Sequence, residues 1–408
     1  MAVTFPVGFR AHGVAAGIKK SGALDMALLW VLGLPDRVSA AMVGTQNQMC
    51  APSVTRNRRV LEETGGFVKA IIINAGCANV ATGPEGIADN ERMAELVILE
   101  SLARLESDAL PNTILTASTG VIGVRLPMDK IAAGIHKLHE VGRTEGIAEN
   151  FAEAIMTTDL VPKTAQIAFE LNGYEVRIGG ACKGSGMIAP NMATMLAFLT
   201  TDAGISPEAL DVALRRAVDV SFNCMTVDGD TSTSDQCILL ASGAAGNDFI
   251  EEPEGPDFEA FVAALSEVCI TLAKKVARDG EGATKLVEVR VTGAPSDADA
   301  KKVGRTIAES PLVKTALFGN DPNWGRLMMA AGRAGVPFDP DNASATLAGI
   351  EVFKNGVPAA FDKAAASEAM KTDEVLVTVD LGAGDGKATF YTCDFSYEYV
   401  KINAEYTT

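Results

Sequence analysis

The chain has 408 residues, of which 48% are hydrophobic and 21% charged. This composition predicts a globular protein with a large core. At about 150 residues per domain, the length predicts two or three domains. The formal net charge of −17 disfavours nucleic acid as a partner, because an acidic surface repels phosphate. No segment approaches the roughly 18 apolar residues that span a bilayer, and the first residues lack the basic and apolar regions of a secretory signal, so we expect a cytoplasmic protein without a membrane partner.

Cysteine and histidine are placed in ways that restrict the chemistry. The seven cysteines are scattered without a CxxC pair, which favours reduced thiols over a disulfide framework or a zinc site. The histidines are His12, His136 and His139, and the last two lie in a segment that predicts an exposed helix. Because no carboxylate or cysteine cluster accompanies them, we expect no metal site there. If the protein has a catalytic nucleophile, we expect its base to be a group other than histidine.

Two strands of the first half end in loops of small residues. Residues 68–73 predict a buried strand that runs into NAGCANVATG, and residues 112–123 predict another that ends at Ser118-Thr119-Gly120. Such a loop can present backbone N–H groups to a ligand, or it can be an ordinary strand-exit turn. Residues 164–186 predict a hairpin, because Asn172-Gly173 suits a type I′ turn between two alternating runs.

The second half mixes helices with further strands. Ser206 followed by Pro207 predicts a helix over 206–218, and residues 257–282 predict a long amphipathic helix that ends at a glycine-rich corner. This mixture predicts an α/β fold, a layered sandwich with mixed sheets and flanking helices. The remaining expectations are a strand at 285–293, a hairpin at 350–361, two strands within 374–395 and an acidic surface loop at 246–259.

The segment KGSGMIAPNMATMLAFLTTDA (183–203) places one threonine between a turn-prone stretch and an apolar one. A threonine hydroxyl is a weak nucleophile until a base takes its proton. If the peptide bond between Ala193 and Thr194 is cut, the new α-amino group, with a pKa near ~8, lies beside the hydroxyl and can be that base. The alternative is a loop followed by an ordinary core strand in which Thr194 is a buried hydroxyl. A phosphate-binding loop is disfavoured, because Lys183 precedes its glycine.

Several separated stretches together resemble the ornithine acetyltransferase family, also called the bifunctional glutamate N-acetyltransferase family. The resemblance implies an acyltransferase of arginine biosynthesis that moves the acetyl group of N2-acetyl-ornithine to glutamate without a cofactor. It leaves open whether acetyl-CoA is a further donor. The stretches cover nearly the whole chain and are GFRAHGVAAGIK, NAGCANVATG, STGVIG, MTTD, KGSGMIAPNMATMLAFLTTDA, DGDTSTSD, DGEGATK, GNDPNWGR and KINAEYTT.

The family resemblance also implies an architecture and a processing step. The fold is expected to be similar to that of self-processing aminopeptidases. The chain is expected to cut itself between Ala193 and Thr194 into an α chain (1–193) and a β chain (194–408), which stay together as an α2β2 heterotetramer. In this scheme Thr194 is the nucleophile that carries the acetyl group as an ester.

Matching the family motifs to this sequence assigns further residues. Thr119 and Gly120 are expected to form the oxyanion hole. Because acetyl-ornithine carries one carboxylate and one ammonium, we assign the carboxylate to Lys183 and the ammonium to Glu281. Thr157 remains an alternative to its neighbour Thr158. The substrate-binding positions that the resemblance implies are Thr158, Lys183, Thr194, Glu281, Asn403 and Thr408.

Two motifs receive no role, and two other functions remain open. DGDTSTSD (Asp228 to Asp235) can be an acidic metal loop or a solvated turn, and GNDPNWGR (Gly319 to Arg326) is assigned no chemistry. A self-processing aminopeptidase or amidohydrolase of similar architecture would pass the acyl group to water instead of glutamate. A binding protein that is never cleaved would keep residues 193 and 194 joined.

Overall fold

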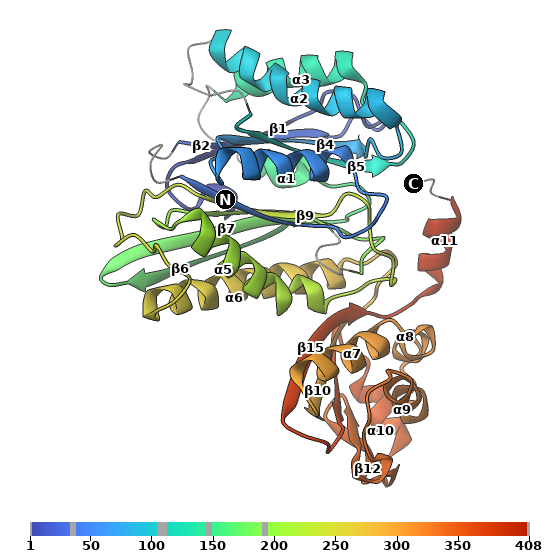
Figure 1. The fold of residues 1–408 in the computed structure, drawn as a ribbon. Helices are drawn as coiled ribbons and strands as arrows, with labels where there is room; N and C mark the ends of the chain where they lie inside the picture. The colour runs from blue at the N-terminus through green and yellow to red at the C-terminus, as the bar shows by residue number, and fades with distance from the viewer. Residues whose placement is uncertain (1, 33–37, 104–111, 143–148, 190–194, 406–408) are drawn as a thin grey trace.

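The computed structural model describes residues 2–32, 38–103, 112–142, 149–189 and 195–405. Within these residues the chain forms three β-sheets. Two sheets stack face to face between layers of helices, and the third builds a separate C-terminal unit beside them (Figure 1). This arrangement confirms the predicted α/β class, a layered sandwich with mixed sheets and flanking helices.

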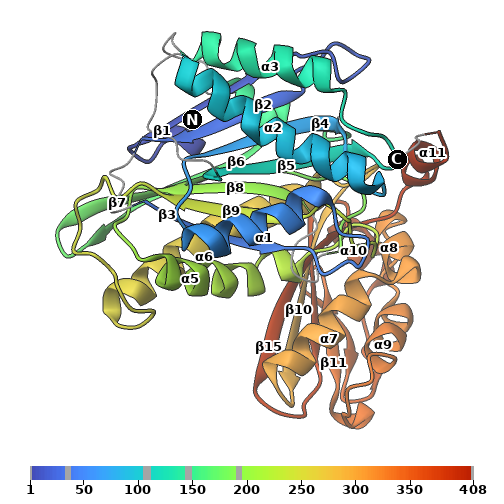
Figure 2. The same ribbon diagram turned by 45° about the horizontal axis from the view of Figure 1, so that its top comes forward.

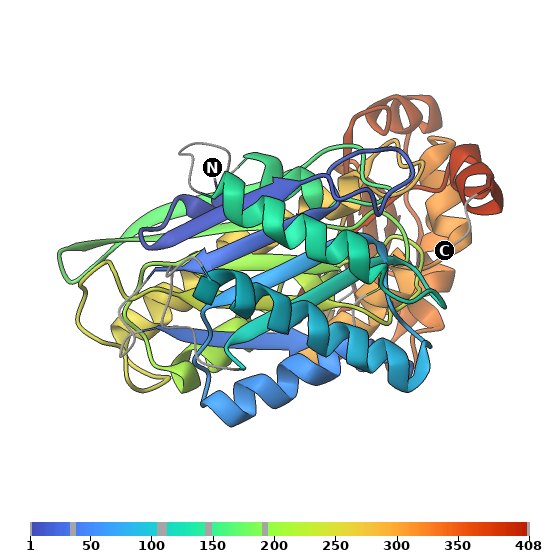
Figure 3. The same ribbon diagram turned by 90° about the horizontal axis from the view of Figure 1, so that it is seen from above.

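The first sheet, sheet A, has four strands in the order β1-β2-β4-β5. The strands β1 and β2 are antiparallel, whereas β4 and β5 run parallel. Helices α2 (Gly83–Ala103) and α3 (Met128–Val141) cover its outer face, as the view from above shows (Figure 3). The strands are β1 (Phe9–Val14), β2 (Met26–Val31), β4 (Ala70–Cys77) and β5 (Ile114–Val121).

The second sheet, sheet B, has five strands in the order β3-β9-β8-β7-β6. Helices α5 (Pro207–Asp219) and α6 (Pro256–Arg278) cover the face that points away from sheet A. The short helices η1 (Ala2–Thr4) and η2 (Phe222–Cys224) belong to the same half of the molecule. The strands are β3 (Ser39–Gly44), β6 (Lys163–Leu171), β7 (Tyr174–Lys183), β8 (Leu196–Thr201) and β9 (Gln236–Ala241).

The strand β8 lies at the centre of sheet B and is buried on both faces. Leu196 and Phe198 pack into the core between the two sheets, while Ala197 and Leu199 pack against the helices α5 and α6. This division follows from the two-residue period of a strand. The apolar run MLAFL therefore forms the buried strand that the sequence predicted.

Local turn and cap chemistry fixes the elements around β8. The hairpin of β6 and β7 turns at Asn172 and Gly173, whose φ angles of 48° and 86° are those of a type I′ turn. Ser206 caps α5, because its side chain accepts a hydrogen bond of 3.1 Å from the amide of Ala209. Both features were predicted from the sequence.

Two further helices pack against the strands of the sandwich, and Figure 2 labels one of them, α1. Helix α1 (Pro52–Thr64) packs against β5 and β3, and α4 (Glu149–Ala154) packs against β1 and β2. Inside, Asn57 of α1 donates to the Thr116 carbonyl of β5 and to the Gln236 side chain of β9, both at 2.7 Å. This buried amide therefore ties sheet A to sheet B.

The C-terminal unit is built on a six-stranded sheet, sheet C, in the order β13-β12-β11-β14-β10-β15. Its helices are α7 (Asp297–Ala308), α8 (Pro311–Phe318), α9 (Trp324–Gly332) and α10 (Lys363–Ala369), with the short helix η3 (Pro340–Asn342). Its strands are β10 (Leu286–Ala294), β11 (Ser344–Leu347), β12 (Ile350–Lys354), β13 (Val357–Pro358), β14 (Glu374–Asp380) and β15 (Gly386–Cys393).

The last helix leaves this unit and returns to the sandwich. After β15 the chain runs into α11 (Tyr397–Glu405), which lies beside the end of β5 (Figure 1). Unlike the other long helices, α11 contains no buried residue. Helix α11 is thus brought from the C-terminal unit back to the edge of the two-sheet body.

One surface prediction was wrong, and another was largely confirmed. Helix α3 is amphipathic, and His139 is buried in it with hydrogen bonds of 3.0 Å to both Ser101 and the Ile135 carbonyl, whereas His136 is exposed. The predicted acidic loop at 246–259 lies largely at the surface, with Glu251, Glu252 and Glu254 exposed, although Asn247 and Ile250 are buried and α6 already begins at Pro256. Asn247 accepts the amide of Gly204 and thereby joins this stretch to the start of α5.

All seven cysteines lie in the described part of the chain and are free thiols. No helix among the described residues has the length and apolar composition needed to cross a membrane. Within the same residues, no group of three or more His, Cys, Asp or Glu side chains has the geometry of a metal site.

Candidate active site

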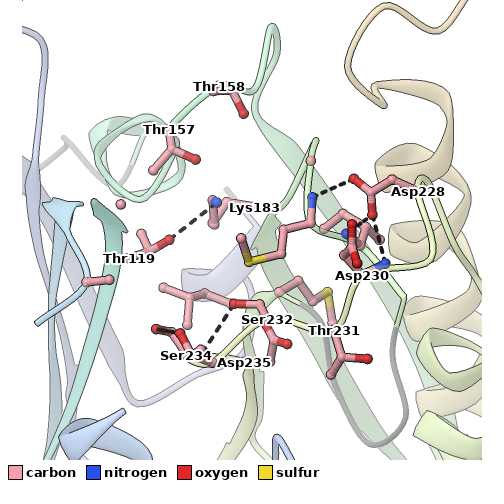
Figure 4. Close-up of a pocket in the computed structure, with 18 of the residues that line it drawn as sticks. Thr119, Thr157, Thr158, Lys183, Asp228, Asp230, Thr231, Ser232, Ser234 and Asp235 are labelled. Carbon is pink, nitrogen blue, oxygen red and sulfur yellow. Dashed lines mark hydrogen bonds between the residues drawn. The ribbon is translucent and has the colours of Figure 1, made fainter. Parts of the chain in front are cut away.

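A cavity of about 450 Å³ lies where sheets A and B meet helix α11 and the loop between α6 and β10. Six residues that the sequence analysis selected line it, and so does Thr157, the alternative to Thr158 (Figure 4). The predicted residues Ala193, Thr194 and Thr408 lie outside the described residues. The six are Thr119, Gly120, Thr158, Lys183, Glu281 and Asn403.

The oxyanion-hole pair sits at the end of two parallel strands. Gly120 of β5 lies opposite Gly76 of β4, and a Cβ atom at Gly120 would come within 2.4 Å of the Gly76 backbone. With φ at 125°, this position also favours glycine conformationally. Immediately before Thr119, Ser118 donates to the Asn74 side chain at 2.7 Å. These contacts hold Thr119 and Gly120 in a rigid position at the cavity wall.

Lys183 is the last residue of β7 and faces Thr119. Its Nζ atom lies 3.4 Å from Thr119 Oγ1, and the residue is only 8% exposed. Burial lowers the pKa of the Lys183 amine, and the carboxylate of Asp159 opposes that effect. A buried amine therefore stands directly beside the proposed oxyanion hole.

A buried ion triad below Lys183 holds the surrounding backbone, and the sequence analysis missed it. Lys163 Nζ lies 2.6 Å from Asp159 Oδ1 and 2.5 Å from Asp279 Oδ2. Asp159 also accepts the amides of Gly184 at 2.6 Å and Thr157 at 2.9 Å. Although burial acts to raise the pKa of Asp159, the charges of Lys183 and Lys163 lower it to about 2.

The other end of the cavity is formed by Glu281 and helix α11. The Glu281 amide donates to the Ser185 carbonyl at 2.9 Å, which joins the corner after α6 to the loop after β7. The Asn403 side chain donates to Glu281 Oε2 at 2.9 Å and to the Tyr399 carbonyl at 3.0 Å. Gly282 allows this approach, because a Cβ atom there would lie 2.5 Å from the Tyr399 amide.

Tyr399 is a cavity residue that the sequence analysis did not select. Its ring stacks on Phe395 with centroids 4.7 Å apart. Burial and the nearby acids Asp228 and Glu281 raise the pKa of its hydroxyl, so the hydroxyl keeps its proton. The sequence could have indicated Tyr399, because it stands four positions before Asn403 and residues at this spacing lie on the same face of a helix.

The motif DGDTSTSD (228–235), which the sequence analysis left open between a metal loop and a solvated turn, is exposed at Gly229 and Asp230 and buried from Thr233 to Asp235. Asp228 accepts the amides of Met187 at 2.7 Å and Ile188 at 2.8 Å, and Thr233, Ser234 and Asp235 are buried. Figure 4 shows residues 231–235 along the side of the cavity opposite Thr157 and Thr158. The motif is therefore a wall of the site.

The motif GNDPNWGR (319–326) supports the site from outside. Asn320 accepts a hydrogen bond from Lys285, the residue that ends the corner carrying Glu281. Trp324 stacks on Phe353 of sheet C with centroids 5.3 Å apart, and Arg326 donates to the Leu312 carbonyl at 3.0 Å. These contacts give the motif a structural role.

The cavity thus carries charges of both signs. The buried Lys183 stands beside the Thr119 hydroxyl, and the lining also contains Tyr399 and the acids Asp228, Asp230, Asp235 and Glu281. A zwitterionic ligand of amino-acid size fits this pattern, with its anionic group at Lys183 and its cationic group near Glu281. The described residues also place Met195, the residue after position 194, in the cavity lining.

Comparison with known proteins assigns the chain to a family. The chain is 50% identical over 408 residues, the whole of both chains, to the arginine biosynthesis bifunctional protein ArgJ of Thermus thermophilus. It is 47% identical, over all of this chain and 98% of the relative, to the protein of that name from Thermosynechococcus vestitus.

Structure comparison agrees with the sequence relatives. The crystal structure of the arginine biosynthesis bifunctional protein ArgJ from Bacillus halodurans is similar, with a TM-score of 0.50 and 43% identity, over 51% of this chain and 98% of that one. The family resemblance that the sequence motifs predicted is confirmed. Residues 10–408 match the model of the ArgJ family, and the chain belongs to that family.

Proposed function

We propose that the protein is an acyltransferase that moves the acetyl group of N2-acetyl-ornithine to glutamate through an acetyl ester on Thr194. The observation that carries this proposal is the convergence of Thr119, Gly120, Lys183, Glu281 and Asn403 on one cavity, next to Met195. The names of the relatives, which place them in arginine biosynthesis, support the same substrate class.

The first half-reaction transfers the acetyl group to the enzyme. The α-amino group of Thr194, freed by cleavage of the bond to Ala193, takes the hydroxyl proton as Thr194 Oγ1 attacks the acetyl carbonyl. The Thr119 hydroxyl and the Gly120 amide stabilise the negative charge that develops on the carbonyl oxygen. Ornithine then leaves, glutamate enters, and its α-amine removes the acetyl group from Thr194.

The charges of the cavity orient both amino acids. Lys183, beside Thr119, binds the α-carboxylate that both substrates carry close to the reacting nitrogen. Glu281 binds the side-chain ammonium of ornithine, and Asn403, which donates to Glu281, positions that carboxylate. Thr158 and Thr408 complete the proposed set of substrate contacts.

Self-cleavage is compatible with the packing, because the two fragments share one sheet. Strand β7, before the cleavage point, pairs with β8, after it, from Ile178 with Thr201 to Lys183 with Leu196. The core between the sheets also combines residues from both fragments. We therefore propose that fragments 1–193 and 194–408 remain associated and assemble as α2β2. The half-length match to the Bacillus halodurans chain supports a division near the middle.

The proposed transfer needs no cofactor, since the acetyl group moves directly between two amines by way of Thr194. Acetyl-CoA would be a further donor if it acylated the same residue. Measuring the mass of the fragment that begins at Thr194 at increasing concentrations of acetyl-CoA, without acetyl-ornithine, tests whether acetyl-CoA is a donor.

Intact-mass analysis tests the proposed function. We expect two fragments, and a gain of one acetyl group on the fragment that begins at Thr194 after incubation with N2-acetyl-ornithine. Added glutamate should remove the acetyl group and yield N-acetylglutamate. A single uncut mass in fully active protein, or equally fast loss of the acetyl group to water without glutamate, would overturn the proposal.

A further inference from the structure

Asp235 is a buried carboxyl group in the cavity wall to which the reaction above assigns no role. The residue is 3% exposed and lines the cavity. Its Oδ2 atom is buried and accepts no hydrogen bond in the described part of the chain. A buried carboxylate oxygen without a partner is costly, and its persistence points to a group that arrives with a ligand.

The backbone holds Asp235 next to the start of β8. The next residue, Gln236, donates its amide to the Met195 carbonyl at 2.9 Å and pairs with Leu196 in the parallel ladder. From the other side, the Thr45 amide donates to the Asp235 carbonyl at 2.9 Å. Asp235 therefore lies beside the strand whose first residues follow position 194.

Four acidic side chains of the described residues line the cavity, and among them only Asp235 has a carboxylate oxygen atom that is itself buried and without a hydrogen bond. Asp228 already accepts two backbone amides, and Asp230 is exposed. Glu281 accepts from Asn403 at the far end. The group best placed to meet a cation at the reacting nitrogen is therefore Asp235.

The proton balance of the proposed transfer requires a second acceptor. Glutamate enters with an α-ammonium that carries three protons, and the amide nitrogen of the product keeps one. Of the two protons that are lost, the α-amine of Thr194 can take one from the attacking nitrogen and pass it to Oγ1 as the ester C–O bond breaks. The other proton must leave before the nitrogen can attack, because only a free amine is a nucleophile.

We propose that Asp235 accepts this proton from the α-ammonium of glutamate and, in the first half-reaction, donates a proton to the departing α-amine of ornithine. The inference rests on the transfer function proposed above. In the second half-reaction the ammonium becomes an amine and the carboxylate becomes a carboxylic acid. The amine then forms the C–N bond, and the ester C–O bond breaks. The next ornithine leaves with this stored proton and with the hydroxyl proton that the α-amine of Thr194 took, so that the cycle closes.

The electrostatic surroundings of Asp235 suit this exchange. Burial raises the pKa of its carboxyl group well above the ordinary value, while the hydrogen bond from Ser232 and the charge of Lys183 oppose the rise. Lys183, at the end of β7, is the charged group that acts on it. A carboxyl group with a raised pKa holds a proton more readily than an ordinary carboxylate, which suits an exchange of protons with an amine.

The variant Asp235→Asn tests the inference with two acceptors. Intact mass first establishes that the variant is cleaved and acetylated. Glutamate should then remove the acetyl group roughly 10²–10⁴-fold more slowly than in the unmodified protein, the usual contribution of a positioned proton acceptor. Hydroxylamine, which is already an unprotonated amine at neutral pH, should react at nearly the unmodified rate. Asp385→Asn, an exposed change between β14 and β15, is the matched control.

The two acceptors separate the outcomes. An equal loss with glutamate and hydroxylamine would overturn the inference, because Asp235 would then hold the nucleophile or the fold. An unchanged rate with glutamate would overturn it as well. If the unmodified protein itself forms no acetyl-enzyme, the proposed function fails, and that result does not depend on Asp235.

Ser232→Ala keeps the inference testable if Asp235→Asn is not cleaved. Removing the Ser232 hydrogen bond raises the pKa of Asp235 further. The rate of glutamate-dependent deacetylation should therefore begin to fall at a higher pH than in the unmodified protein. The pH dependence of the reaction with hydroxylamine should stay the same. A glutamate profile that does not move would count against the assignment.

Discussion

The two ends of the cavity are built in different ways. At one end, Thr119 and Gly120 stand on paired strands, Gly120 is locked against Gly76, and Lys183 lies over the buried ion triad. At the other end, Glu281 stands on a corner and Asn403 on α11, a helix without a buried residue. The first end has the rigidity that acyl transfer needs, because its groups must match the position of a developing charge.

We infer that the end at Thr119 carries out the acyl transfer and that the end at α11 recognises the substrate. The end at Thr119 belongs to the cooperative core, so that damage there should affect both stability and rate. The end at α11 is attached by few contacts, among them the hydrogen bond from Ser396 to the Gly282 carbonyl at 2.6 Å. Regions with few buried contacts open at low cost. We expect substitutions there to change substrate binding while the fold stays intact.

Deletion of residues 403–408 should give the largest effect. The deletion removes Asn403 and with it the hydrogen bond that holds Glu281. We expect transfer to be lost while the thermal unfolding temperature stays the same. Lys401→Ala, an exposed change on the same helix, should leave activity unchanged. Full activity of the truncated chain would show that α11 takes no part in the site.

Thr119→Ala tests the rigid end directly. Removal of one donor to the oxyanion should lower kcat by about 10²–10³-fold, because the remaining Gly120 amide cannot replace it. Acetyl-enzyme formation followed by rapid-quench mass analysis measures the effect. Thr306→Ala on α7 serves as a control outside the cavity. A loss below threefold, with unchanged stability, would remove Thr119 from the oxyanion hole.

The ion triad should make the stability depend on acid pH. The pKa of Asp159 is about 2 in the folded protein, below its ordinary value of 3.8. Its stabilising contribution, on the order of 2 kcal/mol, is therefore complete above the ordinary value and is lost as the pH falls toward 2. Urea unfolding between pH 5 and 2 measures it, and Asp159→Asn should lack this part of the slope. The same slope in both proteins would contradict the assignment.

Glu281→Gln should have the smallest effect and should act on one substrate only. Without the carboxylate, the KM for N2-acetyl-ornithine should rise about tenfold, equivalent to ~1.4 kcal/mol. The KM for glutamate, whose side chain is anionic, should stay the same or fall. Separate assays of the two half-reactions measure this difference. An equal rise in the KM of both substrates would mean that Glu281 stabilises the structure of the site and does not bind the ornithine ammonium.

Much of the fold was predictable because local chemistry and tertiary packing agree. The turn at Asn172-Gly173, the cap at Ser206 and the buried strand at 196–201 each follow from short-range rules that the structure obeys. The family motifs predicted which residues would share a cavity, and Thr119, Lys183 and Glu281 do so.

The remaining features depend on contacts between distant residues. Lys163 and Asp279 are separated by 116 positions, and nothing in the neighbourhood of either residue indicates the other. The same holds for Asn57 and Gln236, which join the two sheets. The burial of His139 was mispredicted for this reason, since Ser101 of another helix supplies its partner.

The sequence by itself determined the family, the candidate nucleophile and the type of each local element, because motif identity and hydrophobic period are written along the chain. Only the tertiary structure decided that DGDTSTSD is a wall of the cavity, that a lysine is buried between two aspartates, and that Asp235 keeps an unpartnered oxygen. Burial and charge at one point are set by residues from many parts of the chain, and these come together only on folding.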